Sequence, residues 1–365
     1  MMRHAYRLPS FFTRLVLASA GALVLASCDP DNEDAKPIYS LNKDGSNVFV
    51  LNEGQYGTPN GEISLFSKTS REVRDVSAFR TVNQRDLGDV VQSMLVVGDR
   101  GYVVLNNSKK VQVLDLRTLQ AEGDAIAGFE QPRYAVAAAT DKVYVTEWVA
   151  LGQPGRVAVL DTRTNKITKT IPVGRQPEQL LLANGKVYVA NSDENTISVI
   201  NPTTDAVETT LTVQDGPSGL VQDAAGAIWV LCGGITRYGG GPTYPVLSST
   251  PANLIKLNAT ATAAALTLPF TRGGAGSLRL NGSKNQLYYR FGGAVYRMNT
   301  TDLTLPTMPL IRRAFYGFDV DPADNTIYGS VAPYTSTGKF IRYQSSGTVI
   351  DSFNVGLLPN GFVFY

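Results

Sequence analysis

The stretch "KVYVANSDENTISVI", Lys186 to Ile200, decides the fold because its pattern recurs along the chain. Two short strands of alternating apolar residues flank a polar turn, which is typical of a β-hairpin. Six other segments resemble the first strand, and the central aromatic residues of the seven are separated by 53, 42, 44, 41, 59 and 40 positions. Four of these intervals lie within 40–44 residues, which is the period of a propeller blade and not that of a helical repeat. The aromatic residues are Phe49, Tyr102, Tyr144, Tyr188, Trp229, Tyr288 and Tyr328.

A second alternating strand follows each aromatic residue, and a polar turn and a third strand then follow. The C-terminal segment "LLPNGFVFY" (357–365) resembles the segments that open other blades, such as "QPEQLLLANG", whereas the first blade has no such segment ahead of it. We expect the last strand to join the first blade, because closing the ring in this way removes both free sheet edges. The sequence therefore predicts an all-β fold, a seven-bladed β-propeller over residues 44–365. The second strands are predicted at 62–66, 111–116, 156–161, 196–201, 253–258, 294–299 and 340–344.

Residues 1–27 have the composition of a secretory signal. Three arginines precede an eleven-residue apolar run, Leu15 to Leu25, which is too short to cross a bilayer as a helix. The run ends in "LASC", and this segment resembles a bacterial lipobox, whose cysteine is acylated and becomes the new N-terminus. An ordinary signal peptide with a coincidental cysteine is the alternative. We expect a signal peptide over 1–27, lipidation of Cys28, and attachment to the membrane by the lipid alone.

An acidic segment, "DPDNEDAKP", follows Cys28. Its composition predicts a solvated tether over residues 28–43. An acidic run behind a lipidated cysteine also resembles the surface-export signal of lipoproteins in one group of Gram-negative bacteria. This resemblance implies an outer-membrane protein that faces the outside of the cell.

The composition excludes several classes of function. A formal charge of +2 over 365 residues is near neutral, so we expect no nucleic-acid partner. Removing residues 1–27 removes His4, the only histidine, so the mature chain has no Ser-His-Asp triad and no histidine-bound zinc, copper or haem. We expect a monomeric protein that is not an enzyme, with no catalytic residues, no resident metal and no cofactor. Cys232, at a strand end, is predicted to be a small buried apolar residue.

The blade segments "VYVAN" (187–191), "VYVTE" (143–147) and "NTISVI" (195–200) resemble the repeats of YVTN-type β-propellers, and the resemblance covers residues 44–365. That family includes binding proteins, structural surface proteins and a few enzymes, so the fold alone gives no function. The segment "NEGQYGTPNGEISLF", Asn52 to Phe66, resembles the surface-lipoprotein propellers typified by the cobalamin-capturing partner of corrinoid transporters. This resemblance implies that the protein captures a corrinoid outside the cell and passes it to a TonB-dependent outer-membrane transporter.

The candidate site lies in the loops, where the blade copies differ. Loops between second and third strands, and loops that lead into each blade, share one face of a propeller. The longest, Cys232 to Asn253, is either functional or a flexible insertion. Aromatic and arginine side chains offer flat apolar contact and planar donors to a large, partly polar ligand such as a corrinoid or a glycan. The candidate ligand-binding residues are Tyr56, Arg85, Arg133, Tyr134, Trp148, Arg175, Arg237, Tyr238, Tyr244, Arg272, Arg312, Tyr316 and Tyr334.

Two other functions stay open beside the capture of an extracellular small molecule. One is a structural or adhesive surface propeller that binds a protein or a glycan. The other is a lactonase that holds calcium through carboxylate and amide groups in the channel. Asn52, Glu53, Glu147 and Asn191 lie at equivalent strand ends and would converge on one face for that purpose.

Overall fold

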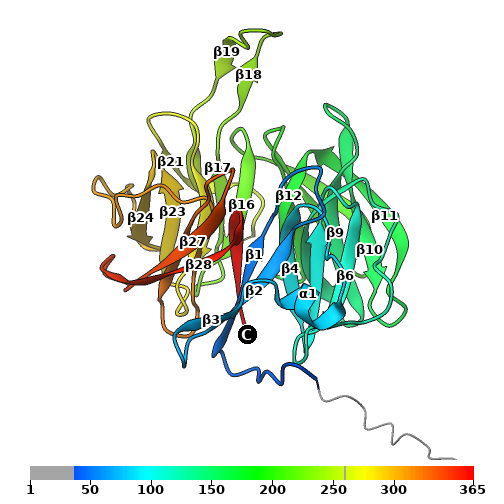
Figure 1. Cartoon of the computed structure of the whole chain (residues 1–365). Helices are drawn as coiled ribbons and strands as arrows, with labels where there is room; N and C mark the ends of the chain where they lie inside the picture. The colour runs from blue at the N-terminus through cyan, green and yellow to red at the C-terminus, as the bar shows by residue number, and fades with distance from the viewer. Residues whose placement is uncertain (1–36, 259) are drawn as a thin grey trace, which may run out of the picture. The chain divides into compact units, whose positions relative to one another are not determined.

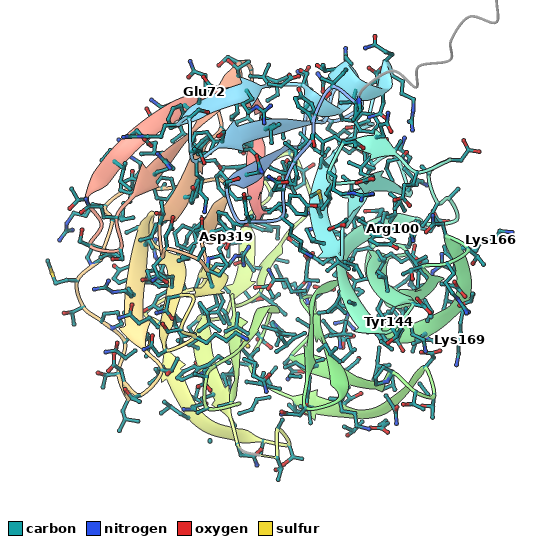
Figure 2. All side chains as sticks on the ribbon, turned by 90° about the horizontal axis from the view of Figure 1, so that it is seen from below. Glu72, Arg100, Tyr144, Lys166, Lys169 and Asp319 are labelled. Carbon is teal, nitrogen blue, oxygen red and sulfur yellow. The ribbon has the colours of Figure 1, made fainter. Side chains whose placement is uncertain are left out.

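The computed structural model describes residues 37–258 and 260–365, and these residues form a seven-bladed β-propeller (Figure 1). Blade six has three antiparallel strands, and each of the other six blades has four. The ring is evident in the view of Figure 2, where Asp319 lies near the centre and Lys166 and Lys169 lie at the rim. The predicted all-β fold and the predicted number of blades are both confirmed.

Blades one to three follow the repeat closely. The strands of each blade are given from the inner to the outer one. Blade one contains β29 (Pro359–Phe364), β1 (Asn47–Asn52), β2 (Glu62–Ser67) and β3 (Glu72–Asp75). Blade two contains β4 (Val91–Val97), β5 (Arg100–Leu105), β6 (Lys110–Asp115) and β7 (Gln120–Ala121), and blade three contains β8 (Gln131–Ala139), β9 (Lys142–Trp148), β10 (Pro154–Asp161) and β11 (Lys166–Arg175). A single short helix, α1 (Ala78–Asn83), lies between blades one and two in the described part of the chain.

The remaining blades include the two departures from the repeat. Blade four contains β12 (Pro177–Ala183), β13 (Lys186–Asn191), β14 (Thr196–Asn201) and β15 (Ala206–Thr212). Blade five contains β16 (Pro217–Gln222), β17 (Ile228–Cys232), β20 (Asn253–Leu257) and β21 (Ala264–Pro269). Blade six contains β22 (Gly276–Leu280), β23 (Gln286–Phe291) and β24 (Ala294–Asn299), and blade seven contains β25 (Phe318–Val320), β26 (Ile327–Val331), β27 (Thr337–Tyr343) and β28 (Val349–Leu357). In blade six, the residues after β24 form only an isolated bridge, from Ile311 to Val295.

The C-terminal strand closes the ring. β29 pairs antiparallel with β1, in a register that places Val48 opposite Phe364 and Leu51 opposite Gly361. The first and last strands of the described chain therefore belong to one blade, as the sequence predicts. This closure leaves β1 paired on both sides, to β29 and to β2, so it presents no free backbone edge.

The repeated aromatic residues form the core between blades. Tyr102 is fully buried and packs in one cluster with Val143 and Val145 of the next blade. Such side chains bury a large apolar area, and this area holds neighbouring sheets face to face. Cys232 ends β17 and is fully buried, which confirms the prediction for it, and burial raises the pKa of its thiol to about 12. The other aromatic residues of the repeat, at positions 49, 144, 188, 229, 288 and 328, are also buried.

The long connection from β17 to β20 folds as a hairpin of β18 (Thr236–Tyr238) and β19 (Val246–Ser249), which projects away from the ring (Figure 1). It leaves the blade between its second and third strands, so it marks the face that we call the loop face. The links between successive blades open on the same face. Within residues 37–258 and 260–365, no helix has the length and apolar character needed to cross a membrane.

Candidate ligand-binding site

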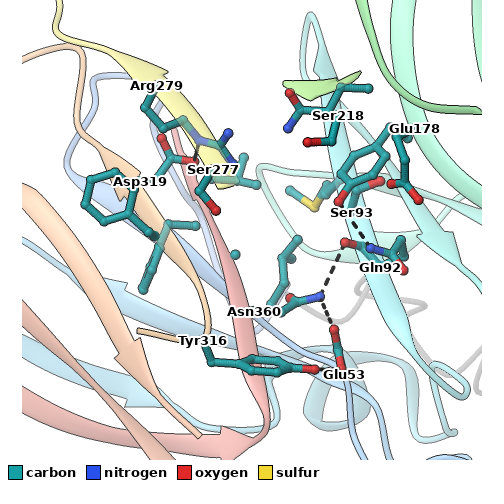
Figure 3. A pocket seen from close by; sticks show the side chains of 18 of the residues that line it. Glu53, Gln92, Ser93, Glu178, Ser218, Ser277, Arg279, Tyr316, Asp319 and Asn360 are labelled. Atoms are coloured by element: carbon teal, nitrogen blue, oxygen red, sulfur yellow. Dashed lines mark hydrogen bonds and ion pairs between the residues drawn. The ribbon is translucent and has the colours of Figure 1, made fainter. Parts of the chain in front are cut away.

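A cavity of about 380 Å³ lies at the centre of the ring and is lined by the inner strands of all seven blades (Figure 3). We call it the channel mouth. Its lining is mostly polar, and its ionisable residues come from blades that are far apart in the chain. Among the residues that line it are Glu53, Gln92, Ser93, Tyr134, Glu178, Ser218, Ser277, Arg279, Arg290, Tyr316, Asp319 and Asn360.

A proline pattern positions several of these side chains. β12, β16 and β29 each begin at a proline, and the next residue, Glu178, Ser218 or Asn360, lines the channel mouth. One residue alone links β11 to β12 and β28 to β29. These two linking residues, Gln176 and Leu358, have φ of 48° and 52°, a left-handed conformation that turns the chain sharply into the inner strand. Proline suits the position because its fixed φ is compatible with the first residue of a strand.

Arg133 connects three blades on one side of the channel mouth. Its Nη2 lies 3.0 Å from Oε1 of Glu178, and its Nη1 donates to Oε1 of Gln92 at 2.6 Å. Its guanidinium also stacks over the ring of Trp148, 4.4 Å from the centroid. Burial raises the pKa of the Glu178 carboxyl, and the charge of Arg133 opposes this rise. The Arg133 side chain is therefore held in place by partners from blades two, three and four.

Glu53 is the centre of a second network, where blades seven, one and two meet. The hydroxyl of Tyr316 donates to its Oε2 at 2.6 Å, and Nδ2 of Asn360 donates to its Oε1 at 2.9 Å. Burial raises the pKa of the Glu53 carboxyl, and these two hydrogen bonds oppose the rise. Nδ2 of Asn360 also donates to the carbonyl of Val91 at 2.9 Å, so the amide orientation follows from its acceptors. The Oδ1 atom of Asn360 is buried and has no partner among the described residues.

The third group of charges comes from blades six and seven. Nε of Arg279 donates to Oδ2 of Asp319 at 2.9 Å. Glu178 and Asp319 are thus each neutralised by an arginine, whereas Glu53 is held by neutral donors. The channel mouth presents fixed donors and acceptors in a partly enclosed space, which is the arrangement that binds polar groups of a small molecule through hydrogen bonds.

The structure brings several predicted residues together and leaves others apart. Arg133, Tyr134 and Trp148 lie together, and Tyr134 and Tyr316 line the channel mouth. Tyr334 contacts Tyr316 edge-to-face, with ring centroids 6.5 Å apart.

Other predicted residues form a second site beside the hairpin. Arg175 and Arg237 share one carboxylate, because Arg175 Nε donates to Asp193 at 3.1 Å and Arg237 pairs with the same residue. They line a cavity of about 420 Å³ between the hairpin and blade four.

The remaining predicted residues lie outside the channel mouth. Tyr56 is 78% exposed, and Tyr238 and Tyr244 are exposed on the projecting hairpin. Arg85 stacks over the ring of Phe79 and hydrogen bonds to Gln112. Arg312 is exposed in the link after blade six, and Arg272 lies over the ring of Phe291. The proposed lipidation residue Cys28, the signal peptide and most of the tether lie outside the described residues.

The strand-end residues considered for calcium have partners of their own. Asn52 and Asn191 are buried and donate to Ser64 and Ser198, each at 3.0 Å. Glu147 is buried and pairs with Arg156 at 2.6 Å. Within the part of the chain that the structure describes, no group of three or more His, Cys, Asp or Glu residues is placed to hold a metal ion.

The sequence interpretation missed most of the channel mouth. It placed Arg133 and Tyr134 in loops, although they belong to the inner strand β8. A signal was present: the dipeptides "PE", "PS" and "PN" open three inner strands, and their second residues line the cavity. The missed residues are Gln92, Glu178, Ser218, Ser277, Arg279, Arg290, Asp319 and Asn360.

One family model matches most of the chain. The model of a family described as "Domain of unknown function (DUF5074)" matches residues 46–355. No curated protein matches the chain.

Solved structures resemble the chain at low sequence identity. A functionally unknown protein from Desulfotomaculum acetoxidans DSM 771 superposes with a TM-score of 0.64 at 13% identity, over 87% of this chain and 98% of the other. A protein from Bacteroides fragilis NCTC 9343, named as a candidate 6-phosphogluconolactonase, gives 0.61 at 14% identity, over 89% and 99%. Hydrazine synthase from Kuenenia stuttgartiensis gives 0.53 at 15% identity, over 72% and 86%. At these identities the similarity establishes the fold alone.

Proposed function

The chain belongs to the DUF5074 family, a domain of unknown function, and from this premise we propose that the protein captures an extracellular small molecule at the channel mouth. The observation that carries the proposal is the polar cavity of about 380 Å³ to which the inner strands of all seven blades contribute. Its volume lies in the range of small-molecule sites. Its side chains are held by networks that exist without a ligand, so binding would require little reordering.

The proposed ligand is a compact polar molecule, or a larger one that inserts a polar group. A corrinoid is larger than the cavity, so it would lie on the loop face and place amide side chains in the channel mouth. Support for a corrinoid comes from the resemblance at Asn52 to Phe66, a segment that supplies Glu53 to the cavity. Arginines and tyrosines around the mouth offer donors and flat apolar surface to such a ligand.

The proposed setting is the outer surface of the cell. Lipidation at Cys28 would anchor the protein, and the acidic tether would hold the propeller outside the outer membrane. Captured ligand would then pass to a TonB-dependent transporter. Replacing Cys28 with serine should abolish labelling of the expressed protein by radioactive palmitate, and continued labelling would contradict the anchor.

Isothermal titration calorimetry tests the capture function. A soluble form that begins at Asp29 retains the whole propeller and would be titrated with cobalamin, cobinamide and a set of neutral sugars. We expect saturable heat with one binding site per chain for a member of this set. Glu53→Gln and Asn360→Ala should weaken that binding at least about tenfold, because the first replaces an acceptor oxygen of the cavity wall with a donor and the second removes both polar atoms of the amide.

A rim variant serves as the control for the calorimetry. Lys169→Gln alters a charged residue at the rim of the ring and should leave the affinity unchanged. No heat with either corrinoid from folded protein would exclude the corrinoid assignment. Binding that both channel-mouth variants leave intact would exclude the channel mouth as the site.

A further inference from the structure

A further cavity, on the loop face of blade six, adjoins the channel mouth. Its volume is about 290 Å³, and four glycines, Gly274, Gly276, Gly292 and Gly293, contribute to its wall. Arg290 lines both this cavity and the channel mouth, so the two spaces share one guanidinium as their common wall. A ligand held in the channel mouth could therefore extend one group into the glycine-lined cavity.

Arg290 has donors that no described residue satisfies. Its Nη1 donates to the carbonyl oxygens of Phe315 and Tyr316, the latter at 2.8 Å. Its Nε is buried without an acceptor, and no hydrogen bond of its Nη2 is found within residues 37–258 and 260–365. A buried donor without an acceptor costs about 1–3 kcal/mol, which an oxygen atom of a ligand would recover. Burial and the nearby charge of Arg279 both lower the pKa of Arg290, as expected for a cation that lacks a counter-ion.

A second arginine, Arg272, lies beside two residues of the cavity wall, Phe291 and Gly292. The guanidinium of Arg272 lies 5.8 Å from the ring centroid of Phe291, and its Nη2 lies 3.4 Å from the position that a Cβ atom at Gly292 would take. In the described part of the chain, neither Arg272 nor Arg290 has a carboxylate within ion-pair distance. The other arginines around the channel mouth, Arg133 and Arg279, are paired with acids.

The charge of this region is unbalanced in the sequence itself. Between Pro269 and Gly317 the chain has seven basic residues and one acidic residue, Asp302, whereas the whole chain is almost neutral. A concave surface bordered by charge of one sign concentrates counter-ions. The absence of side chains at the glycines leaves room for a ligand group, and a Cβ at Gly274 would meet no atom within 4 Å.

From these observations we propose that the glycine-lined cavity of blade six is an anion subsite, in which Arg290 and Arg272 bind a phosphate or carboxylate group of the captured ligand. Arginine suits this role because its planar donors match the oxygens of both groups. The inference rests on the proposed function, since it assigns part of the captured ligand. It adds that the ligand is anionic at one end and that blade six sets its orientation.

Inorganic phosphate and acetate are the probes for a direct test. Each would be titrated into ¹⁵N-labelled protein that begins at Asp29, and the Nε–Hε signals of the arginines would be followed by NMR. We expect saturable shifts of the Arg290 and Arg272 signals with one probe or both, and the stronger response identifies the group. Arg272→Gln should weaken binding at least about tenfold. Absence of any saturable shift at Arg290 with either anion would overturn the subsite.

Two further variants keep the test independent of folding. Gly276 has room for a side chain, because a Cβ there would approach only Nη2 of Arg290, at 3.9 Å. Gly276→Val should therefore fill the cavity and block the anion while Arg290 remains. Arg297→Gln removes a charge from the same blade, where Arg297 donates to the carbonyl of Ser345, and should bind the anion as the unaltered protein does. Unchanged anion binding in both Gly276→Val and Arg272→Gln would overturn the proposal.

The test separates this inference from the proposed function. If calorimetry finds a captured ligand whose affinity Arg272→Gln and Gly276→Val leave unchanged, the anion subsite is wrong and capture stands. If phosphate or acetate binds at Arg290 but no corrinoid or sugar binds, the subsite stands and those ligands are excluded.

Discussion

The hydroxyl of Tyr316 donates a 2.6 Å hydrogen bond to Glu53, although 263 positions separate the two residues in the chain. Tyr316 precedes β25 of blade seven and Glu53 follows β1 of blade one. Asn360 of the closing strand β29 binds the other carboxylate oxygen. The seam that closes the ring is therefore also a wall of the channel mouth, and its integrity determines both stability and the shape of the site.

Replacing Tyr316 with phenylalanine should raise the pKa of the Glu53 carboxyl further. The hydrogen bond from Tyr316 stabilises the charged carboxylate of Glu53, so its loss favours the protonated form. A hydrogen bond of about 1 kcal/mol corresponds to roughly one pKa unit. A ¹³C NMR titration of the carboxyl signals would measure the change. Tyr334→Phe is the matched control, because Tyr334 contacts Tyr316 but has no hydrogen bond to Glu53. An equal pKa of Glu53 in the Tyr316→Phe variant and the unaltered protein would contradict this prediction.

Glu62 should make the protein less stable as the pH rises. Burial raises the pKa of its carboxyl from 4.5 to about 7, although the backbone N–H groups of Ile63, Phe79 and Arg80 donate to it. A raised pKa in the folded chain means that the protonated group stabilises the fold below pH 4.5. This contribution is lost as the pH rises to about 7.

Urea unfolding of the unaltered protein and of Glu62→Gln, at pH 4.5 and pH 8, would measure this effect. The difference in unfolding free energy between the two proteins should change by about 3 kcal/mol, with the unaltered protein relatively weaker at pH 8. Glu72→Gln removes an exposed carboxylate of β3 and serves as the control. A difference that does not vary with pH would rule out the raised pKa.

The closing strand should contribute strongly to stability through Phe362. This side chain is 5% exposed and packs against Tyr328 and Phe340, with ring centroids 5.4 and 5.8 Å away. Phe362→Ala should lower the unfolding free energy by about 3–5 kcal/mol, because it leaves a cavity between blades. Chemical denaturation would measure the loss, and Val349→Ala, at an exposed position of β28, should change stability by less than about 0.5 kcal/mol. A loss of similar size in both variants would be inconsistent with closure by β29.

The thiol of Cys232 should be unreactive in the folded protein. It is fully buried, and burial raises its pKa to about 12, so almost no thiolate forms at pH 8. A thiol-specific disulfide reagent should label it only after denaturant unfolds the chain. Rapid labelling of the native protein that begins at Asp29, which has no other cysteine, would show that β17 opens readily.

The fold could be predicted from the sequence because every blade repeats the same local requirement. Alternate residues of a strand such as "KVYVAN" face the two neighbouring blades and are buried on both sides, and the recurrent aromatic residue fills the space between neighbouring sheets. The repeat also revealed the displaced inner strand, since "LLPNGFVFY" matched a part that blade one lacked. The irregular end of blade six had no such signal, because Thr300 to Gly317 departs from the repeat and takes its course from its contacts.

The sequence by itself determined the number of blades, the closure by the last strand and the absence of histidine from residues 28–365. These follow from periodicity and composition, which are local properties of the chain. Only the tertiary structure decided the site, because the residues that line it come from all seven blades. Glu53, Tyr316 and Asn360 meet only when the ring closes. The sequence cannot show that Arg133 pairs with the carboxylate of Glu178 while Arg290 has no carboxylate partner among the described residues, since charge pairing depends on distances that the fold sets.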